Sequence, residues 1–209
     1  MNVRTILKTA APVMPVLTID NPALAAPLAD ALAAGGMRVA EITLRTPGAI
    51  ESIAAMRKAV PELLVGAGTV LTPEMMLAVK RAGGQFAVSP GFTEILADAA
   101  IEYQMPLLPG VVTAGEIQTA IERGYKDLKF FPAESAGGVT LLASYASVFR
   151  DICFCPTGGI KPGNMNDYLA LKNVMCVGGS WVAPRKLIEA KDWQGITNLV
   201  ASAQSTNCH

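Results

Sequence analysis

Histidine is nearly absent from this sequence: among its 209 residues only the last one, His209, is a histidine. A histidine-based metal site or a Ser-His catalytic pair therefore cannot form inside the fold. Cysteine is scarce as well, and the four residues Cys153, Cys155, Cys176 and Cys208 are too few and too irregularly spaced for a disulfide framework. The first two are separated by one residue, whereas common zinc and redox motifs have a gap of two. We therefore expect reduced thiols and no metal site, in a protein of the cytoplasm.

An excess of charge is also lacking, because 17 basic and 17 acidic side chains cancel. This balance removes the electrostatic signature of a nucleic-acid-binding protein. No apolar stretch reaches the roughly 20 residues of a membrane span, and Pro12 and Pro15 interrupt the apolar run near the N-terminus. Only 16% of the residues are charged and 51% are hydrophobic, which favours strands buried on both faces and a surface partly covered by other subunits. We expect an oligomer with neither a nucleic-acid nor a membrane partner.

Eight short apolar segments of strand length recur along the chain. They cover residues 13–19, 39–44, 63–70, 86–91, 106–112, 127–133, 152–159 and 174–180. Alanine-rich segments with helix signals separate them, for example a capping box from Thr113 to Glu116. Pro27, inside the first helical pattern, indicates a kink or a late helix start. Eight alternations of strand and helix without a linker predict an α/β fold, a single-domain (β/α)8 TIM barrel over residues 1–209.

A doubly wound sheet is the alternative architecture. It would require a glycine-rich turn after the first strand, and none is present there. The segment GAGTVL at residues 66–71 has two of the three glycines of a dinucleotide fingerprint but opens no immediate helix. The barrel is the better prediction, and a barrel carries its active site at the carboxyl ends of its strands.

The second predicted strand carries an acid and a base on one face. Glu41, Thr43 and Arg45 are two residues apart, so their side chains point to the same side of the strand. An ordinary salt bridge between Glu41 and Arg45 at the rim is the commoner outcome for such a pattern on its own. The functional alternative is an acid–base group beside a guanidinium that can bind a carboxylate.

The sixth predicted strand contains a lysine between apolar residues. Lys129 and Phe131 lie on one face and Phe130 on the other, so Lys129 faces the lumen if Phe130 faces the helices. A lysine in such a strand either extends its ammonium to water or is held inside as a free amine. Apolar walls and a nearby Arg45 favour the free amine, which is the nucleophile that forms a Schiff base with a ketone.

Glycine pairs end the seventh and eighth predicted strands, at residues 158–159 and 178–179. They can be simple turns, but barrels often bind phosphate after these two strands, through backbone N–H groups that glycine leaves accessible. With Lys129 as the nucleophile and Arg45 for a carboxylate, the residues predict a substrate that has a keto acid at one end and a phosphate at the other.

Six motifs, in order along the chain, resemble those of one enzyme family. They are EITLRT (41–46), VGAGTVL (65–71), FAVSPG (86–91), LKFFPAE (128–134), CPTGGI (155–160) and VGGSW (177–181). From about Met14 to Pro184 the chain resembles the family of 2-keto-3-deoxy-6-phosphogluconate (KDPG) and 4-hydroxy-2-oxoglutarate (KHG) aldolases. The resemblance implies a homotrimeric class I aldolase without a metal or other cofactor, which cleaves KDPG to pyruvate and glyceraldehyde 3-phosphate in the Entner–Doudoroff route.

The resemblance also implies roles for particular residues. Lys129 matches the Schiff-base lysine and Glu41 the acid/base residue. The substrate-binding matches are Arg45 and Thr69 for the carboxylate, Pro90 and Phe131 for pocket walls, Thr157 for the hydroxyl region, and Gly158, Gly159, Gly179 and Ser180 for the phosphate. One loop departs from the family pattern: Thr113 is flanked by Val112 and Ala114, where a small or hydroxyl residue often precedes the threonine and a proline often follows it.

Alternative functions remain open. Within the family, cleavage of KHG to pyruvate and glyoxylate involves no phosphate, and Ser180 with the glycine pairs favours the phosphorylated substrate. Outside it, a barrel isomerase or synthase could use Lys129 as a simple cation, and a non-catalytic sugar-phosphate binder could use it as a charge partner. Trapping with pyruvate and borohydride separates these classes, because it marks only a Schiff-base lysine.

Overall fold

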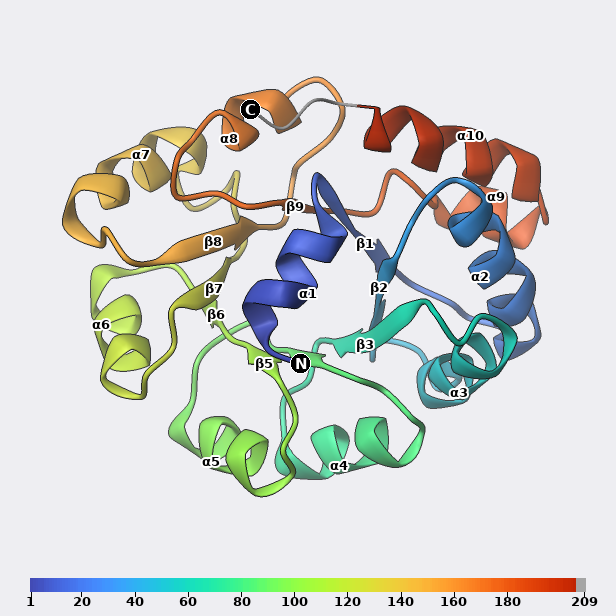
Figure 1. Cartoon of the computed structure of the whole chain (residues 1–209), viewed down its shortest axis with the longest axis horizontal. Coiled ribbons are helices and arrows are strands. Elements are labelled where there is room, and N and C mark those ends of the chain that lie inside the picture. The colour runs from blue at the N-terminus through green and yellow to red at the C-terminus, as the bar shows by residue number, and fades with distance from the viewer. Residues whose placement is uncertain (206–209) are drawn as a thin grey trace.

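The computed structural model describes residues 1–205, and all of its paired strands are parallel (Figure 1). The strands are β1 (Val13–Leu17), β2 (Val39–Thr43), β3 (Leu64–Gly68), β4 (Ala87–Val88), β5 (Leu107–Leu108), β6 (Gly110–Val111), β7 (Asp127–Phe130), β8 (Cys153–Pro156) and β9 (Val177–Gly179). They form a six-stranded sheet of order β5-β4-β3-β2-β1-β9 and a three-stranded sheet of order β6-β7-β8. Each predicted segment contains at least one strand, so the strand pattern is confirmed, although the strands are shorter than predicted. Cys208 and His209 lie outside the described residues.

The two sheets adjoin each other at both edges. Pro109 is the one residue between β5 and β6, which together match the fifth predicted strand. Proline has no N–H to donate to a strand ladder, and its carbonyl oxygen accepts from the backbone N–H of Lys129 on β7 (2.8 Å). At the other edge an isolated parallel bridge pairs Thr157, which follows β8, with Gly178 of β9. Each edge of the small sheet therefore lies beside an edge of the large one.

Helices surround the strands, as Figure 1 shows. They are α1 (Val3–Ala10), the 3-10 helix η1 (Pro22–Leu24), α2 (Ala25–Ala34), α3 (Ala49–Ala59), α4 (Pro73–Arg81), α5 (Glu94–Glu102), α6 (Ala114–Glu122), α7 (Gly138–Val148), α8 (Met165–Leu169), α9 (Arg185–Glu189) and α10 (Trp193–Gln204). Pro27 lies in the first turn of α2, where its missing N–H breaks no helical bond, which confirms the late start. The capping box of Thr113 and Glu116 is also confirmed. None of the helices within residues 1–205 is long and apolar enough to cross a membrane.

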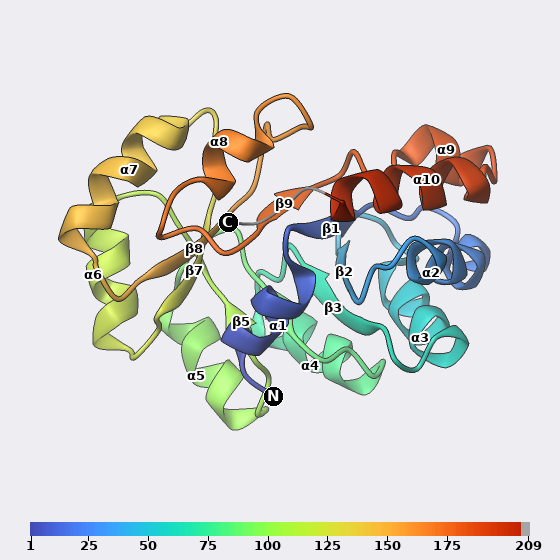
Figure 2. The same ribbon diagram turned by 45° about the horizontal axis from the view of Figure 1, so that its top comes forward.

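Helix α1 closes the amino ends of the strands. Asn2 caps it by accepting from the backbone N–H of Thr5 (2.9 Å), and Ile6, Leu7 and Ala10 are buried beneath it. These three side chains form one cluster with Met14, Val39, Phe86, Val88, Leu108, Cys155 and Cys176 of the strands and their flanks. Figure 2 separates the two ends of the molecule: the loop from β8 to α8 rises at the top, whereas α1 and the N-terminus lie toward the bottom.

A second core lies between the strands and the outer helices, and it extends from Val13 to Ala203. In it, the rings of Phe130 on β7 and Phe154 on β8 pack edge to face, with centroids 6.4 Å apart. Phe154 also stacks on Tyr145 of α7. Phe130 thus faces the helices, and its neighbour in β7, at position 129, faces the interior, as predicted.

Candidate active site

Lys129 and Glu41 meet in the interior between the two sheets. Nζ of Lys129 lies 3.2 Å from Oε1 of Glu41, and the two side chains are only 6% and 3% exposed. They belong to β7 and β2, which are neighbours in neither sheet, so the contact crosses the interior. The lysine does not extend to water but is paired with a buried carboxylate. An amine beside a proton acceptor is the arrangement of a nucleophile with its acid–base group.

Gly68 makes room for the Glu41 carboxylate. A Cβ atom at this position would lie 2.0 Å from Glu41 Oε1, which no side chain can tolerate. Glu41 is in register with Gly66, and its side chain leans along the strand direction toward Gly68. In the sequence these two glycines suggested only a weak nucleotide fingerprint. Gly68 clears the surface of β3 beside the ion pair, whereas Gly66 makes room for Phe86, whose ring would lie 2.5 Å from a Cβ on Gly66.

Arg45 lies at the rim and forms no ion pair with Glu41, so the ordinary rim salt bridge, which was the alternative to a functional role, is not observed. Residue 45 follows the end of β2 and is exposed, and its Nε donates to Thr69 Oγ1 (3.1 Å). The group in contact with the Lys129 amine is therefore the carboxyl group of Glu41. Arg45, which the sequence suggested as a positively charged neighbour of this amine, contacts Thr69 instead. Arg45 and Thr69 instead form one polar pair at the carboxyl end.

Thr69 has an unusual backbone conformation. Its φ of 60° lies in the left-handed region, which β-branched residues rarely adopt. Such strained residues cluster at functional sites, where the surrounding structure holds them in place. The strain supports a binding role for Thr69 independently of its contact with Arg45.

Phe131 and Pro90 flank the interior. The ring centroid of Phe131 lies 5.3 Å from Lys129 Nζ, close enough for a cation–π contact. Pro90 is half-buried and follows the end of β4. A Cβ atom on Gly110 would lie only 2.2 Å from the carbonyl oxygen of Pro90. Phe131 therefore lies against Lys129, and the segment at Pro90 packs on β6, the strand that pairs with β7.

Thr157 and the two glycines after it form the loop that leaves β8. Thr157 is buried, and a Cβ on Gly178 would lie 2.2 Å from its Oγ1. Gly158 and Gly159 have φ values of 104° and 79°, which glycine adopts without strain. The backbone N–H of Glu134 donates to the carbonyl oxygen of Gly158 (3.1 Å), so the loop after β7 supports the loop after β8.

Glu134 also anchors this pair of loops to α8. Tyr168 Oη donates to Glu134 Oε1, and a Cβ on Gly159 would lie 2.6 Å from Glu134 Cγ. Burial, and then the hydrogen bond to Glu134, raise the pKa of Tyr168. Tyr168 therefore remains a neutral donor that holds Glu134 against the glycine loop.

A cavity of about 730 Å³ opens at the carboxyl end. Its lining residues are Val16, Thr18, Gly159, Ile160, Lys161, Ser180, Trp181, Ala183, Pro184 and Arg185. This cavity brings together two of the residues predicted to bind the phosphate, Gly159 and Ser180. Gly158 and Gly179 do not line it, and Gly179 is buried beneath the Trp181 ring, where a Cβ would lie 1.8 Å from Cζ3. The cations Lys161 and Arg185 were not predicted for this site, although both follow the glycine motifs closely in sequence.

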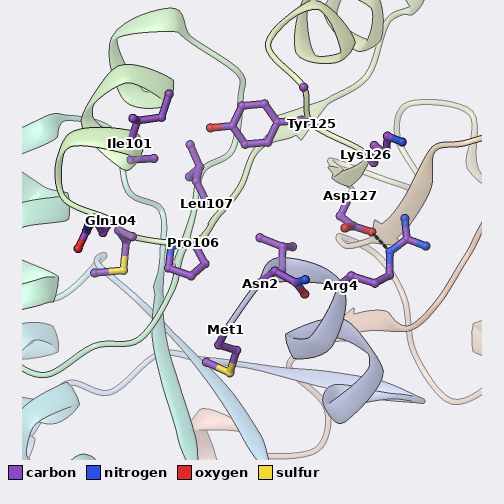
Figure 3. A pocket seen from close by; sticks show the side chains of 14 residues that line it. Met1, Asn2, Arg4, Ile101, Gln104, Pro106, Leu107, Tyr125, Lys126 and Asp127 are labelled. Carbon is purple, nitrogen blue, oxygen red and sulfur yellow. Dashed lines mark ion pairs between the residues drawn. The ribbon is translucent and has the colours of Figure 1, made fainter.

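A second cavity, of about 490 Å³, lies at the amino ends between α1, α5 and the start of β7 (Figure 3). Arg4 and Asp127 form an ion pair at 2.5 Å on its wall, drawn as a dashed line in Figure 3. Burial raises the pKa of Asp127, and the Arg4 guanidinium lowers it in part. Lys126 also lines this cavity, beside the ion pair of Arg4 and Asp127. None of the predicted site residues lines this cavity.

Within residues 1–205 no group of three or more His, Cys, Asp or Glu side chains is arranged to hold a metal ion. The cysteines described, Cys153, Cys155 and Cys176, are all buried. Cys155 and Cys176 lie with their sulfur atoms 3.6 Å apart in the cluster beneath α1.

Comparison with known proteins places this arrangement among aldolases. A family model for KDPG and KHG aldolases matches residues 3–199. The KHG/KDPG aldolase of Escherichia coli (strain K12) is 51% identical over 195 residues, which are 93% of this chain and 92% of that protein. The 2-dehydro-3-deoxy-phosphogluconate aldolase of Dickeya dadantii (strain 3937) is 50% identical over 195 residues, which are again 93% of this chain and 92% of that protein.

Solved structures agree with these sequence matches. The KDPG aldolase of Legionella pneumophila, with pyruvate captured at low pH as a covalent carbinolamine intermediate, is 45% identical with a TM-score of 0.93, covering 95% of this chain and 97% of that one. The KDPG aldolase of Zymomonas mobilis ZM4 with 3-phosphoglycerate is 47% identical with a TM-score of 0.91, covering 96% and 94% of the two chains.

Proposed function

Because the chain belongs to the KDPG and KHG aldolase family, we propose that it is a class I aldolase, a lyase that cleaves KDPG to pyruvate and glyceraldehyde 3-phosphate in the Entner–Doudoroff route. The observation that carries this function is the buried contact between Lys129 and Glu41. The carbinolamine trapped in the Legionella relative supports covalent catalysis through a lysine. Cleavage of KHG to pyruvate and glyoxylate is a second activity, favoured by the combined KHG/KDPG name of the Escherichia coli relative.

Lys129 acts as the nucleophile in the proposed mechanism. Its Nζ attacks the C2 carbonyl carbon of the substrate, and loss of water from the carbinolamine gives a protonated imine. A base takes the proton of the C4 hydroxyl, the C3–C4 bond breaks, and its electron pair moves into the imine to leave an enamine and the aldehyde product. Protonation of the enamine at C3, followed by hydrolysis, releases pyruvate and restores the amine.

Glu41 moves the protons in these steps. Its carboxylate lies 3.2 Å from the amine, within the reach of a general acid–base group. In the carbinolamine the same carboxylate can pass a proton to the departing hydroxyl, and through a water molecule it can accept the proton of the C4 hydroxyl. No metal or other cofactor is required, because the protonated imine accepts the electron pair. The absence of a metal remains a prediction.

The two ends of the substrate bind to different groups. We assign the carboxylate to Arg45 and Thr69, the pocket walls to Pro90 and Phe131, the hydroxyl region to Thr157, and the phosphate to Gly158, Gly159, Gly179 and Ser180. The hydrogen bond from Arg45 to Thr69 supports the first assignment. The cavity that contains both Gly159 and Ser180 supports the last one.

The architecture proposed for this enzyme is a closed (β/α)8 barrel that forms one domain over residues 1–209. Counting β5 and β6 as one strand gives the required number of strands, and the Thr157–Gly178 bridge supports closure at the remaining edge. The continuous core from Val13 to Ala203 supports a single domain. A location in the cytoplasm stays a prediction.

The proposed assembly is a homotrimer. Large apolar side chains are exposed on three neighbouring helices, α5, α6 and α7 (Figure 1). They are Ile95, Ile101, Ile121 and Val148, which are 41–71% exposed. Apolar side chains gathered on one side favour burial against another subunit. Sedimentation at the mass of a single 21.8-kDa chain would contradict this assembly.

Borohydride trapping tests the proposed function. Pyruvate and borohydride together should add one stable adduct per chain, on the peptide that contains Lys129. Lys129→Arg should form no adduct and should lose about 10⁴-fold or more in kcat, because a guanidinium keeps the charge but cannot form the imine. An adduct that maps to Lys126 or Lys161, or an active Lys129→Arg variant, would overturn the assignment.

A further inference from the structure

The cavity at the carboxyl end holds two cations that the proposed mechanism does not use. Lys161 and Arg185 line it together with Gly159 and Ser180, two of the residues assigned to the phosphate. The residues assigned to the phosphate offer only neutral N–H and O–H donors, yet a phosphate carries close to two negative charges at neutral pH. A cation on the cavity wall would favour a phosphorylated substrate over one without phosphate.

The two cations differ in whether their charge is already paired. Arg185 Nε lies 2.6 Å from Asp20 and 3.2 Å from Glu189, so two carboxylates share its guanidinium. Lys161 is exposed, and within residues 1–205 its Nζ makes no ion pair or hydrogen bond. The ammonium of Lys161 is therefore the uncommitted positive charge of this cavity.

The backbone of Lys161 is fixed beside the glycine loop. Its N–H donates to Asn164 Oδ1 (2.8 Å), and Asn164 Nδ2 donates to the carbonyl oxygen of Gly159 (3.3 Å). Asn164 thus ties Lys161 to the segment that ends at Gly159. A lysine with an anchored backbone and three rotatable N–H donors suits a phosphate, whose several oxygens accept without a single fixed geometry.

We propose that Lys161 is the specificity-determining cation for the substrate's phosphate, an inference that rests on the proposed aldolase function. KHG ends in a carboxylate on C4, next to the bond that breaks, whereas the phosphate of KDPG lies two carbons farther away. Lys161 therefore contacts the phosphate of KDPG, whereas KHG has no group at this distance for Lys161 to bind. Arg185, held by Asp20 and Glu189, contributes less.

Substitution of Lys161 tests this inference through substrate preference. In Lys161→Gln the ratio of kcat/KM for KDPG to kcat/KM for KHG should fall about tenfold, mainly through KM for KDPG. Arg185→Gln should lower the ratio less. Lys186→Gln is the matched control, because it removes the same charge from an exposed position in α9 that does not line the cavity, and the ratio should stay within about twofold.

Ligand binding gives a readout that does not depend on turnover. Titration calorimetry with 3-phosphoglycerate should show affinity about tenfold weaker for Lys161→Gln than for the wild type, and the wild-type affinity should fall more steeply with added salt. Glycerate, which lacks the phosphate, should bind the two proteins alike. An unchanged KDPG preference or unchanged 3-phosphoglycerate affinity in Lys161→Gln would overturn the role of Lys161, provided that Lys129 still forms the pyruvate adduct. Failure of that adduct in the wild type would instead overturn the aldolase function.

Discussion

The amino and carboxyl ends of the parallel strands differ in the side chains that lie there. At the amino end, Ile6, Leu7 and Ala10 of α1 pack on apolar side chains and thiols. At the carboxyl end, the interior holds the ion pair of Lys129 and Glu41, with loops around a cavity. The same strands thus carry stability at one end and chemistry at the other, as expected for parallel strands whose carboxyl ends are left to the loops.

Strand β8 shows how short the distance between the two regions is. Cys155 packs in the cluster beneath α1, whereas Thr157, two residues later on the same face, lies against Gly178 at the carboxyl end. Cys155 is in register with Lys129 on β7. Two residues along one face of the strand therefore separate a core position from a position at the site. Substitutions in the core should change stability, and substitutions at the site should change activity.

The largest effect is expected from the acid at the carboxyl end. Glu41→Gln keeps the shape of the side chain but removes the proton acceptor, so kcat for KDPG should fall about 10²–10⁴-fold in steady-state assays. The pyruvate adduct on Lys129 should still form, because the amine remains. Glu51→Gln, at an exposed position of α3, is the control and should leave kcat unchanged. A Glu41→Gln enzyme within about threefold of the wild type would remove Glu41 from the chemistry.

A substitution in α1 should affect stability and leave the chemistry intact. Leu7 is fully buried, and Leu7→Ala should lower the free energy of unfolding by about 2–5 kcal/mol in urea titrations. Leu71, which is 52% exposed, gives a control in which Leu→Ala should change stability by less than about 0.5 kcal/mol. At a temperature where both proteins are folded, kcat/KM of Leu7→Ala should match the wild type. A large loss of kcat/KM there would show that the two ends are coupled.

The smallest effect is a pH dependence of stability at the amino end. Burial raises the pKa of Cys153 from 9.0 to about 11. Because the folded-state pKa is the higher one, its contribution to stability is fully present below about pH 9 and is lost as the pH rises toward about 11. Between about pH 8 and about pH 10.5 the wild type should lose about 2 kcal/mol more unfolding free energy than Cys153→Ala. Parallel pH profiles for the two proteins would show that the thiolate is not disfavoured by burial.

Local patterns in the sequence predicted most of the strand arrangement. The two-residue period placed Phe130 toward the helices and Lys129 inward, since both directions follow from one backbone geometry. The same period placed Arg45 on the face of Glu41, but the two side chains form no ion pair. Strand β2 ends at Thr43, so Arg45 leaves the strand face, and the partner of Glu41 comes from β7 across the interior.

Features that depend on distant parts of the chain could not be read from local patterns. Helix α1 was not among the predicted elements, because its burial depends on side chains from strands that lie far along the chain. Gly68 looked like part of a nucleotide loop, and its role follows only from the position of the Glu41 side chain. The cavity cations were missed for the same reason: the direction of a loop after a strand is set by its neighbours, as the contact between Glu134 and Gly158 illustrates.

Because α1 fills the amino end, molecules that reach Lys129 travel through the carboxyl end. In the proposed mechanism the pyruvyl group bound to Lys129 lies deepest, and the phosphorylated part of the substrate lies toward the rim, where Ser180 and Gly159 line the cavity. In a site that opens at one end only, the group that binds last must leave first. For the proposed reaction, we expect the aldehyde product to depart before pyruvate is hydrolysed from Lys129 and, in the synthetic direction, pyruvate to bind before the aldehyde. On this proposal helix α1, which packs at the end opposite the cavity, sets the order in which the two halves of the substrate enter and leave.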